Sequence, residues 1–386
     1  MGYAVPKYLA EKLEKAIMPP GHWFNLFYSG YDDSSFKVEG TAKNEALNKI
    51  ADKKVDEKCK EGVLKRQESL ALKLNAQIFP VKLTSPLAVG LGNEHPVENG
   101  FSFLVPYGLP YISGSGIKGV LRRAAELMSS GNYSVDNDKV MVESDDVGLL
   151  FGVEGDGKDD SPEKMGAKGC LRFWDAFPDI DKMAVEVMTP HYSHYLNPEP
   201  NKEPAAPHDQ GKPIPIPFLV VPSDKNMNII VDCATDLIPD NYRWEEKLES
   251  IIVFAGKWVG LGAKTAIGYG AFEINTALYE EKKREKLEEL RLSSMTPEDR
   301  EIAEAEGSLK KLSDDFNELK RVDKQFKPGE IKHKEMLDKI FKLCAELKSE
   351  SCKKLLDEVL KYVDKKSKKG KEVKDKIKEL FPEKEG

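Results

Sequence analysis

Residues 108–123 read GLPYISGSGIKGVLRR, and this stretch decides the fold class of the chain. Small turn residues at Ser113–Gly116 run directly into a segment with helical periodicity. The apolar side chains that repeat at this spacing are Ile117, Val120, Leu121, Ala124 and Met128. The pattern predicts an amphipathic helix that packs one face against a core.

Segments with the character of β-strands flank this helix in the sequence. They are residues 76–89, 169–177, 183–188, 218–221, 227–233 and 268–274. We expect residues 218–221 and 227–233 to pair as a hairpin, because a short, turn-rich segment joins them. A second helix is predicted at 243–257. The order strand, helix, strands, helix, strand predicts an α+β protein with a ferredoxin-like sandwich.

The density of charged residues changes at about residue 279. From residue 280 to residue 386, 56 of 107 residues are charged, against about a quarter of the residues before them. This change predicts a boundary between a mixed body and a helical extension. The parts we expect are a mostly helical N-terminal segment at 1–72, an α+β domain at 73–279 and a charged all-α extension at 280–386.

Composition limits the cellular setting. The net charge of −7 gives no overall attraction to nucleic acid, so any such binding needs a local basic patch. The sequence contains no run of about 18 apolar residues, so it predicts no membrane-spanning helix. The N-terminus lacks the apolar centre of a signal peptide. The five cysteines are scattered without a CxxC pair, which argues against a zinc ribbon and a disulfide framework. We therefore expect a cytoplasmic protein.

The C-terminal extension contains clear helix boundaries. Thr296-Pro297-Glu298-Asp299 is a helix start with Thr296 as the N-cap. Pro328 and Gly329 predict that this helix ends close to Phe326. Later apolar repeats predict further amphipathic helices of a small bundle. The lysine-rich run 365–376 is compatible with nucleic-acid contact, but its interleaved acids favour a solvated helix end.

The turn before the helix at residue 114 has the features of an anion site. Free backbone N–H groups at a helix start attract anions, and phosphate is the natural occupant. Lys118 and Arg122, four residues apart, share one helix face beside it. The residues assigned to this site are Ser113, Gly114, Ser115, Gly116, Lys118, Arg122 and Arg123. The alternative is a capped core helix whose basic side chains face solvent.

Residues 260–270, GLGAKTAIGYG, form a second candidate site. They are not a P-loop, because Ala263 precedes Lys264 and because a helix precedes the loop and a strand follows it. Glycines let the backbone approach a ligand closely and lysine adds charge, which suits a phosphodiester. The residues assigned here are Gly260, Gly262, Ala263, Lys264, Thr265, Gly268 and Tyr269. The alternative is a tight helix-to-strand turn.

A proline-rich excursion at 189–222 opens with the sequence TPHYSHY. Its ring-bearing side chains, which suit stacking on nucleotide bases, are His191, Tyr192, His194 and Tyr195. The HxxH spacing has no carboxylate or cysteine at a standard distance to complete a metal site, so we assign no metal and no cofactor. The alternative is a packed loop with ordinary surface aromatics.

Together these features resemble the RAMP superfamily of CRISPR effector proteins, which have RRM-like folds and a C-terminal glycine-rich loop. The segments that resemble the superfamily are residues 112–123, 170–178 and 260–270. Three other segments, residues 85–96, 189–195 and 213–219, are similar to the family of sixth subunits of type III-B (Cmr) effector complexes. The resemblance covers about residues 73–275 and leaves out the C-terminal extension.

The resemblance implies a structural, non-catalytic subunit that binds the 3′ part of the guide RNA and helps present it for pairing. The implied partners are guide RNA, target RNA and the other RAMP subunits of the complex. The residues implied to contact guide phosphates are Lys118, Arg122, Arg123 and Lys264. The excursion at 189–222 would act like a thumb that interrupts the guide–target duplex.

Two other interpretations stay open. A CRISPR endoribonuclease would need a general base such as His22 or His191 near a cation, or a metal held by Asp145 and Asp146, or by Asp175. A protein–protein adaptor would instead use the charged helical extension as its working part.

Overall fold

The computed structural model describes residues 5–13, 16–32, 35, 37–38, 40–131, 141–155, 166–189, 215–322, 331–363 and 368–381. The chain divides into two compact units, Met1–Lys283 and Arg284–Gly386. Within the described part, no helix is both long enough and apolar enough to cross a membrane.

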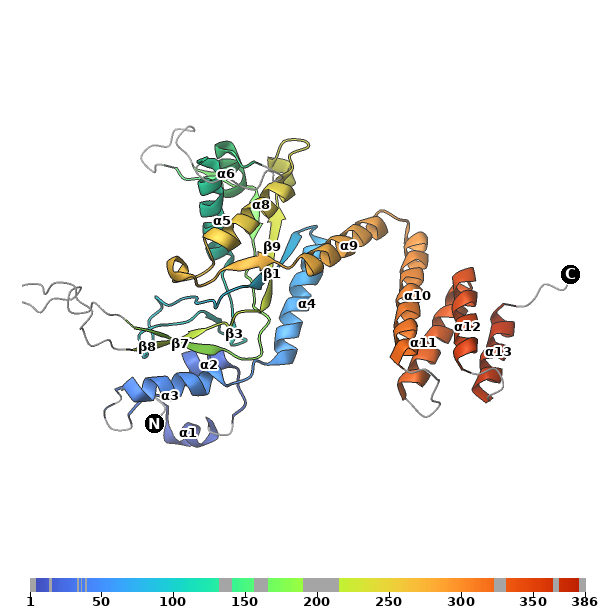
Figure 1. Ribbon diagram of the computed structural model, residues 1–386, viewed down its shortest axis with the longest axis horizontal. Helices are drawn as coiled ribbons and strands as arrows, with labels where there is room; N and C mark the ends of the chain where they lie inside the picture. Colours follow the sequence, from blue (N-terminus) through green and yellow to red (C-terminus); the bar gives the residue numbers. More distant parts are fainter. Residues whose placement is uncertain are drawn as a thin grey trace, which may run out of the picture. The chain divides into compact units, whose positions relative to one another are not determined.

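A four-stranded antiparallel sheet forms the centre of the first unit (Figure 1). Its strands are β1 (Gln77–Leu83), β6 (Leu171–Phe173), β9 (Asn226–Cys233) and β10 (Phe272–Ile274). They lie in the order β10-β1-β9-β6, so the first and third of these strands occupy the middle. Phe79 lies opposite Ile229, and Phe173 lies opposite Val231. Aromatic and β-branched residues favour such a buried, pleated position.

Two helices pack side by side on one face of this sheet (Figure 1). Helix α5 (Gly114–Ser129) lies between β1 and β6 in the chain, and α8 (Trp244–Trp258) lies between β9 and β10. Every second side chain of a strand points to the same face, and on this face Phe79 and Ile229 join the main core. Leu121 of α5 and Ile251 of α8 belong to the same core. The helix predicted after the turn at Ser113–Gly116 is thus confirmed.

Helix α4 (Glu57–Lys73) packs against the other face of the sheet (Figure 1). Ala71 of α4 shares a small core with Ile78 and Ile230, whose side chains point away from α5 and α8. The Asn228 amide also donates a hydrogen bond of 3.0 Å to Glu68 of α4. The sheet is therefore covered on both faces.

A separate two-stranded sheet, formed by β7 (Ala184–Met188) and β8 (Ile216–Val220), corrects one prediction. The expected hairpin of residues 218–221 with 227–233 is wrong: β8 pairs with β7, whereas β9 pairs with β1 and β6. Val221 also pairs with Leu87, in the segment after β1. Strand pairing depends on which side chains the core buries, and that set is not decided by closeness in sequence.

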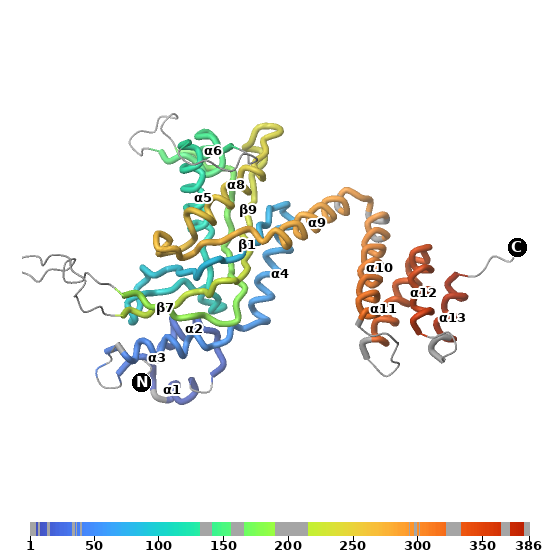
Figure 2. The backbone as a smooth tube through the Cα atoms, in the orientation of Figure 1, coloured from blue at the N-terminus to red at the C-terminus, as the bar shows by residue number. Residues whose placement is uncertain are grey.

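The remaining elements of the first unit complete its periphery. They are α1 (Lys7–Leu13), α2 (Pro20–Asn25), α3 (Gly40–Ala51), β2 (Phe103–Leu104), β3 (Leu109–Pro110), α6 (Ser144–Phe151), β4 (Gly152–Val153), β5 (Ala167–Lys168), η1 (Thr235–Leu237) and η2 (Thr265–Ile267). Helix α3 lies against β7 and β8 (Figure 2). The helices expected before residue 72 thus pack within the same unit as the sheet.

Helix α9 (Thr276–Ser293) crosses the boundary, and the second unit otherwise consists of helices. They are α10 (Pro297–Val322), α11 (Ile331–Leu347), α12 (Glu350–Tyr362) and α13 (Lys368–Leu380). Thr296 accepts a hydrogen bond from the Asp299 N–H, which confirms the predicted helix start. Phe316, Ile340 and Leu356 lie in a core that these helices share.

Candidate nucleic-acid interface

The glycine-rich loop begins where α8 ends. Gly260 has a φ of +76°, and its N–H donates to the Ala255 carbonyl over 2.8 Å, which closes the last turn of α8. The Ala263 N–H then donates to the Ala88 carbonyl over 2.7 Å. A Cβ on Gly262 would lie 2.2 Å from that same carbonyl oxygen. Glycine is therefore required here for the close approach of two backbone segments.

Lys264 carries the charge of this loop and is held against the β7–β8 hairpin. Its Nζ lies 2.6 Å from Sδ of Met188 and 5.4 Å from the centre of the Phe218 ring. The side chain is half-buried. Among the described residues, Lys264 forms no ion pair with a carboxylate. A partly desolvated ammonium without a counter-ion favours an anionic ligand.

Tyr269 fastens the other side of the loop to the same hairpin. Its ring centre lies 5.9 Å from that of Phe218, in a small core with Ala88 and Val220. Burial and the neighbouring carboxylate of Glu186 raise the pKa of the Tyr269 hydroxyl. The loop and the base of the hairpin are thus joined by apolar and polar contacts.

The start of α5 differs from the expected phosphate site. The Ser113 Oγ accepts a hydrogen bond from the Gly116 N–H over 3.2 Å, and an Asp175 carboxylate oxygen accepts one from the Gly114 N–H over 2.8 Å. A carboxylate of the chain itself therefore uses part of the positive end of the helix. A Cβ on Gly114 would lie 2.2 Å from the Phe173 carbonyl oxygen, so this glycine serves the packing of α5 on β6.

The basic residues of α5 have different surroundings. Arg122 Nε lies 3.1 Å from a carboxylate oxygen of Glu126, and Arg123 Nη1 lies 3.6 Å from the other. Lys118 is half-buried and forms no ion pair within the ranges that the structure describes. Of the three cations assigned to this helix, Lys118 has the least compensated charge. Ser115, the remaining turn residue, is exposed.

The excursion predicted at 189–222 is described only at its two ends. Met188 and Ile216 are the last pair of the β7–β8 hairpin, so the excursion leaves from a paired base. The ring-bearing residues assigned to it, His191, Tyr192, His194 and Tyr195, lie outside the described residues.

Three of the residues named for an endoribonuclease, His22, Asp146 and Asp175, are engaged in structural contacts, whereas Asp145 is exposed. His22 Nε2 lies 2.8 Å from the Val105 carbonyl oxygen, and Asp175 caps α5. Asp146 receives hydrogen bonds from Tyr242 and Lys247, both of 2.5 Å. No group of three or more histidine, cysteine, aspartate or glutamate residues gathers around one point in the described ranges. His191 lies outside them.

Sequence reasoning missed the residues that position the loop. Met188, Phe218 and Glu186 surround Lys264 and Tyr269, yet Met188 and Lys264 are 76 positions apart in the chain. No local motif marks such a contact. The one feature of the sequence that could have indicated this contact was the pair of short apolar strands on either side of the excursion.

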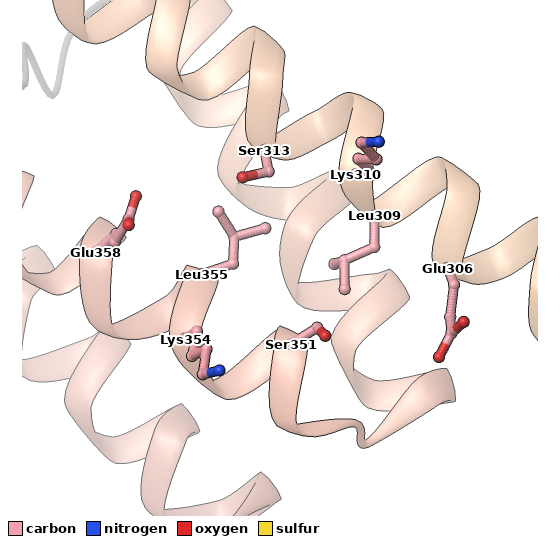
Figure 3. A pocket seen from close by; sticks show the side chains of 8 residues that line it. All are labelled: Glu306, Leu309, Lys310, Ser313, Ser351, Lys354, Leu355 and Glu358. Carbon is pink, nitrogen blue, oxygen red and sulfur yellow. The ribbon is translucent and has the colours of Figure 1, made fainter.

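The second unit contains a groove of its own, between α10 and α12 (Figure 3). Its volume is about 410 Å³. Leu309 and Leu355 point toward each other across it, and the polar lining residues are Glu306, Lys310, Ser313, Ser351, Lys354 and Glu358. Two acids and two lysines give the groove no net charge, so it has no preference for a polyanion.

The sequence profile that matches this chain lies within the first unit. The sequence profile of the RAMP superfamily matches residues 81–273, which run from β1 to β10. The Cmr6 subunit of the CRISPR system of Pyrococcus furiosus is 31% identical over 237 residues, which are 51% of this chain and 67% of that protein.

Solved structures show partial similarity to the chain. A cryo-EM structure of the type III-B Cmr-β complex bound to cognate target RNA contains a chain with 21% identity and a TM-score of 0.42, over 60% of this chain and 71% of that one. The crystal structure of Cmr6 from Pyrococcus furiosus has 27% identity and a TM-score of 0.29, over 52% of this chain and 97% of that one. From the profile match and the sequence identity, the chain belongs to the RAMP superfamily, in the family of the Cmr6 subunits of CRISPR systems.

Proposed function

We propose that this chain is a structural subunit of a cytoplasmic type III-B CRISPR effector complex, where it binds guide RNA and helps present it to target RNA. The family membership and the 31% identity to a Cmr6 subunit support the complex. Its partners are guide RNA, target RNA and the other RAMP subunits. The part of the guide that it binds is the 3′ part.

Lys264 is the observation that supports RNA contact best. It is a half-buried cation without a carboxylate partner in the described part of the chain, on a glycine-rich loop that is open at Gly268. Contacts to phosphates are independent of base sequence, as a subunit that accepts any guide requires. Lys118 of α5 is the second phosphate contact. Arg122 and Arg123 share Glu126 and contribute less.

The sheet with α5 and α8 is a ferredoxin-like domain in this proposal. The chain order of its elements, the strand order β10-β1-β9-β6 and the antiparallel pairing support that assignment. Domains of this kind often bind RNA on the open sheet face. Here α4 packs on that face, so the RNA contacts belong to loops: the glycine-rich loop, the start of α5 at Ser113–Gly116 and the excursion at 189–222.

The excursion at 189–222 is the thumb in this proposal. Its base is the β7–β8 hairpin, and Lys264 and Tyr269 of the glycine-rich loop pack on that base. A guide backbone that binds Lys264 would therefore lie beside the root of the thumb. The proposal assigns no catalytic residue, in keeping with the structural contacts of Asp146 and Asp175.

The salt dependence of RNA binding tests the proposal. The protein should be titrated with an unstructured single-stranded RNA at several salt concentrations. Lys264→Gln should weaken binding to a similar extent across RNA sequences. It should also reduce the slope of log affinity against log salt by about one unit, because one phosphate contact is lost. Lys118→Gln should act in the same direction.

Lys65→Gln is the matched control. Lys65 lies on α4 and pairs with Glu61 over 3.0 Å, so its charge is already compensated. Its replacement should leave the salt slope unchanged. A salt slope that is the same for Lys264→Gln as for the unaltered protein would refute Lys264 as a phosphate contact, and absence of RNA binding would refute the proposed function.

A further inference from the structure

Trp258 is an exposed tryptophan immediately before the glycine-rich loop. Its side chain is 63% exposed, whereas Trp23 and Trp244 are each 5% exposed and Trp174 is packed against a small core. It is the last residue of α8 and lies two positions before Gly260. Exposing a large indole to water is unfavourable. Single exposed apolar side chains are common on protein surfaces, so it is the position of Trp258 beside the glycine-rich loop, together with its charged neighbour, that indicates a ligand.

The sequence that begins just before Trp258 is positively charged. Residues 257–270 contain two lysines and no acid, in a chain with a net charge of −7. The Lys257 Nζ lies 5.2 Å from the centre of the Trp258 ring, within the range of a cation–π contact. In the part of the chain that the structure describes, neither Lys257 nor Lys264 forms an ion pair. A polyanion with aromatic groups fits this combination.

The loop returns to the neighbourhood of Trp258. The methyl group of Thr265 lies 3.1 Å from the place where a Cβ on Gly260 would stand. Thr265 follows Lys264 directly, so the lysine proposed to bind phosphate belongs to the part of the loop that folds back onto the end of α8. A Cβ on Gly268 would meet no atom within 4 Å, so the loop is open at this residue.

We propose that Trp258 is a stacking platform for one base of the RNA bound at the glycine-rich loop. The inference rests on the proposed function and adds a base subsite to its phosphate contact. Stacking on an indole is tolerant of sequence, because every base has a π-face. The end of α8 carries partial negative charge, so a neutral base is better placed over Trp258 than a phosphate. The ammonium group of the neighbouring Lys257 adds a positive charge beside the base that stacks on Trp258.

Intrinsic fluorescence of the full-length protein tests the inference. Trp258 is exposed, so the difference between the emission of the unaltered protein and that of Trp258→Phe isolates its signal. A saturating oligouridylate of about a dozen nucleotides should quench this difference signal, because a stacked base quenches an indole. The same sugar–phosphate strand with abasic residues should bind more weakly and leave the signal unquenched.

Affinity measurements on two variants complete the test. Trp258→Ala should weaken oligouridylate binding by about tenfold, because base–aromatic stacking makes a contribution of that size. Trp258→Phe, which keeps a ring, should lose much less. Trp258→Ala should leave the salt slope unchanged, in contrast to Lys264→Gln, because no charge is removed. The exposed position of Trp258 predicts an unchanged melting temperature for both variants.

The outcomes separate this inference from the proposed function. RNA binding with full affinity by Trp258→Ala, with no quenching of the Trp258 signal, would overturn the stacking platform and leave the RNA-binding subunit intact. An unchanged RNA affinity together with loss of a neighbouring protein subunit would assign Trp258 to a protein interface and would also overturn it. Absence of any RNA binding by the unaltered protein would overturn both.

Discussion

Asp146 illustrates how a single carboxylate is held inside this fold. The residue is 6% exposed and accepts hydrogen bonds from the Tyr242 hydroxyl, the Lys247 ammonium and the Glu143 N–H. Burial alone would raise the pKa of the carboxyl group. The hydrogen bonds from Lys247, Tyr242 and the Glu143 backbone outweigh burial, and the pKa lies below its usual value. The contacts join α6 to the start of α8.

Asp146→Asn should therefore destabilise the protein in a pH-dependent way. At pH 7 we expect a loss of about 3 kcal/mol, because Lys247 is left without its partner. A carboxylate with a lowered folded pKa contributes fully above its unfolded pKa of about 3.9 and loses that contribution as the pH falls through the folded pKa. The difference between variant and unaltered protein should shrink below about pH 4.

Urea unfolding at several pH values, followed by tryptophan fluorescence, measures this difference. All four tryptophans lie in the first unit, so the signal reports the unit that contains Asp146. Asp181→Asn is the control, since Asp181 is exposed and should change little. A destabilisation by Asp146→Asn that stays constant down to pH 3 would contradict the lowered pKa.

The glycine-rich loop is the element on which the site depends, and its glycines are not equivalent. Gly268 and Gly270 both have positive φ angles, +96° and +72°. A Cβ on Gly270 would lie 1.9 Å from the Leu261 carbonyl oxygen, whereas one on Gly268 would meet open space. Of these two glycines, only Gly270 is thus required for both its backbone angle and its close packing.

Gly270→Ala should destabilise the first unit more than Gly268→Ala. The positive φ costs about 1 kcal/mol in either variant. The clash with Leu261 adds about 1–3 kcal/mol at Gly270 alone. Urea unfolding measured by tryptophan fluorescence gives both values, and Gly268→Ala is the matched control. Equal losses for the two variants would show that the close approach of Gly270 to Leu261 is wrong.

At the scale of the whole molecule, the chain consists of a unit that carries the family match and a helical unit outside it. The match ends at residue 273, and the units meet within α9. The first part of α9 still packs with the first unit: the Tyr279 ring lies 5.3 Å from that of Phe79, and Lys282 pairs with Glu68. The helical unit has a core of its own.

Truncation after Ser293 should leave RNA affinity unchanged. The shortened chain keeps all of α9, and therefore the contacts of Tyr279, but it lacks the helices α10–α13. Filter binding with a single-stranded RNA measures the affinity. A second truncation after Ile274, which removes Tyr279, should lower the melting temperature of the first unit. Loss of RNA affinity on truncation after Ser293 would favour the adaptor interpretation of the helical extension.

Features encoded in adjacent residues were predictable from the sequence. The start of α10 follows from Thr296 and Pro297, and the start of α5 follows from Ser113 and the apolar repeat after it. Their physical cause is local, because a cap and a helical stripe need only neighbours within a few positions. The glycine-rich loop could be located in the same way.

Contacts between distant segments were not predictable. The sequence did not indicate that Asp175 caps the start of α5, and it paired β8 with the wrong strand. It also gave no sign that α4 covers the second sheet face.

The sequence by itself therefore determined the helices α5, α8 and α10, the turn residues before α5, the charged extension and the family. Only the tertiary structure decided that Lys264 lies on the hairpin base, with no carboxylate partner among the residues that the structure describes, and that Trp258 stays exposed. The physical reason is that burial and charge compensation depend on which side chains the whole core brings together.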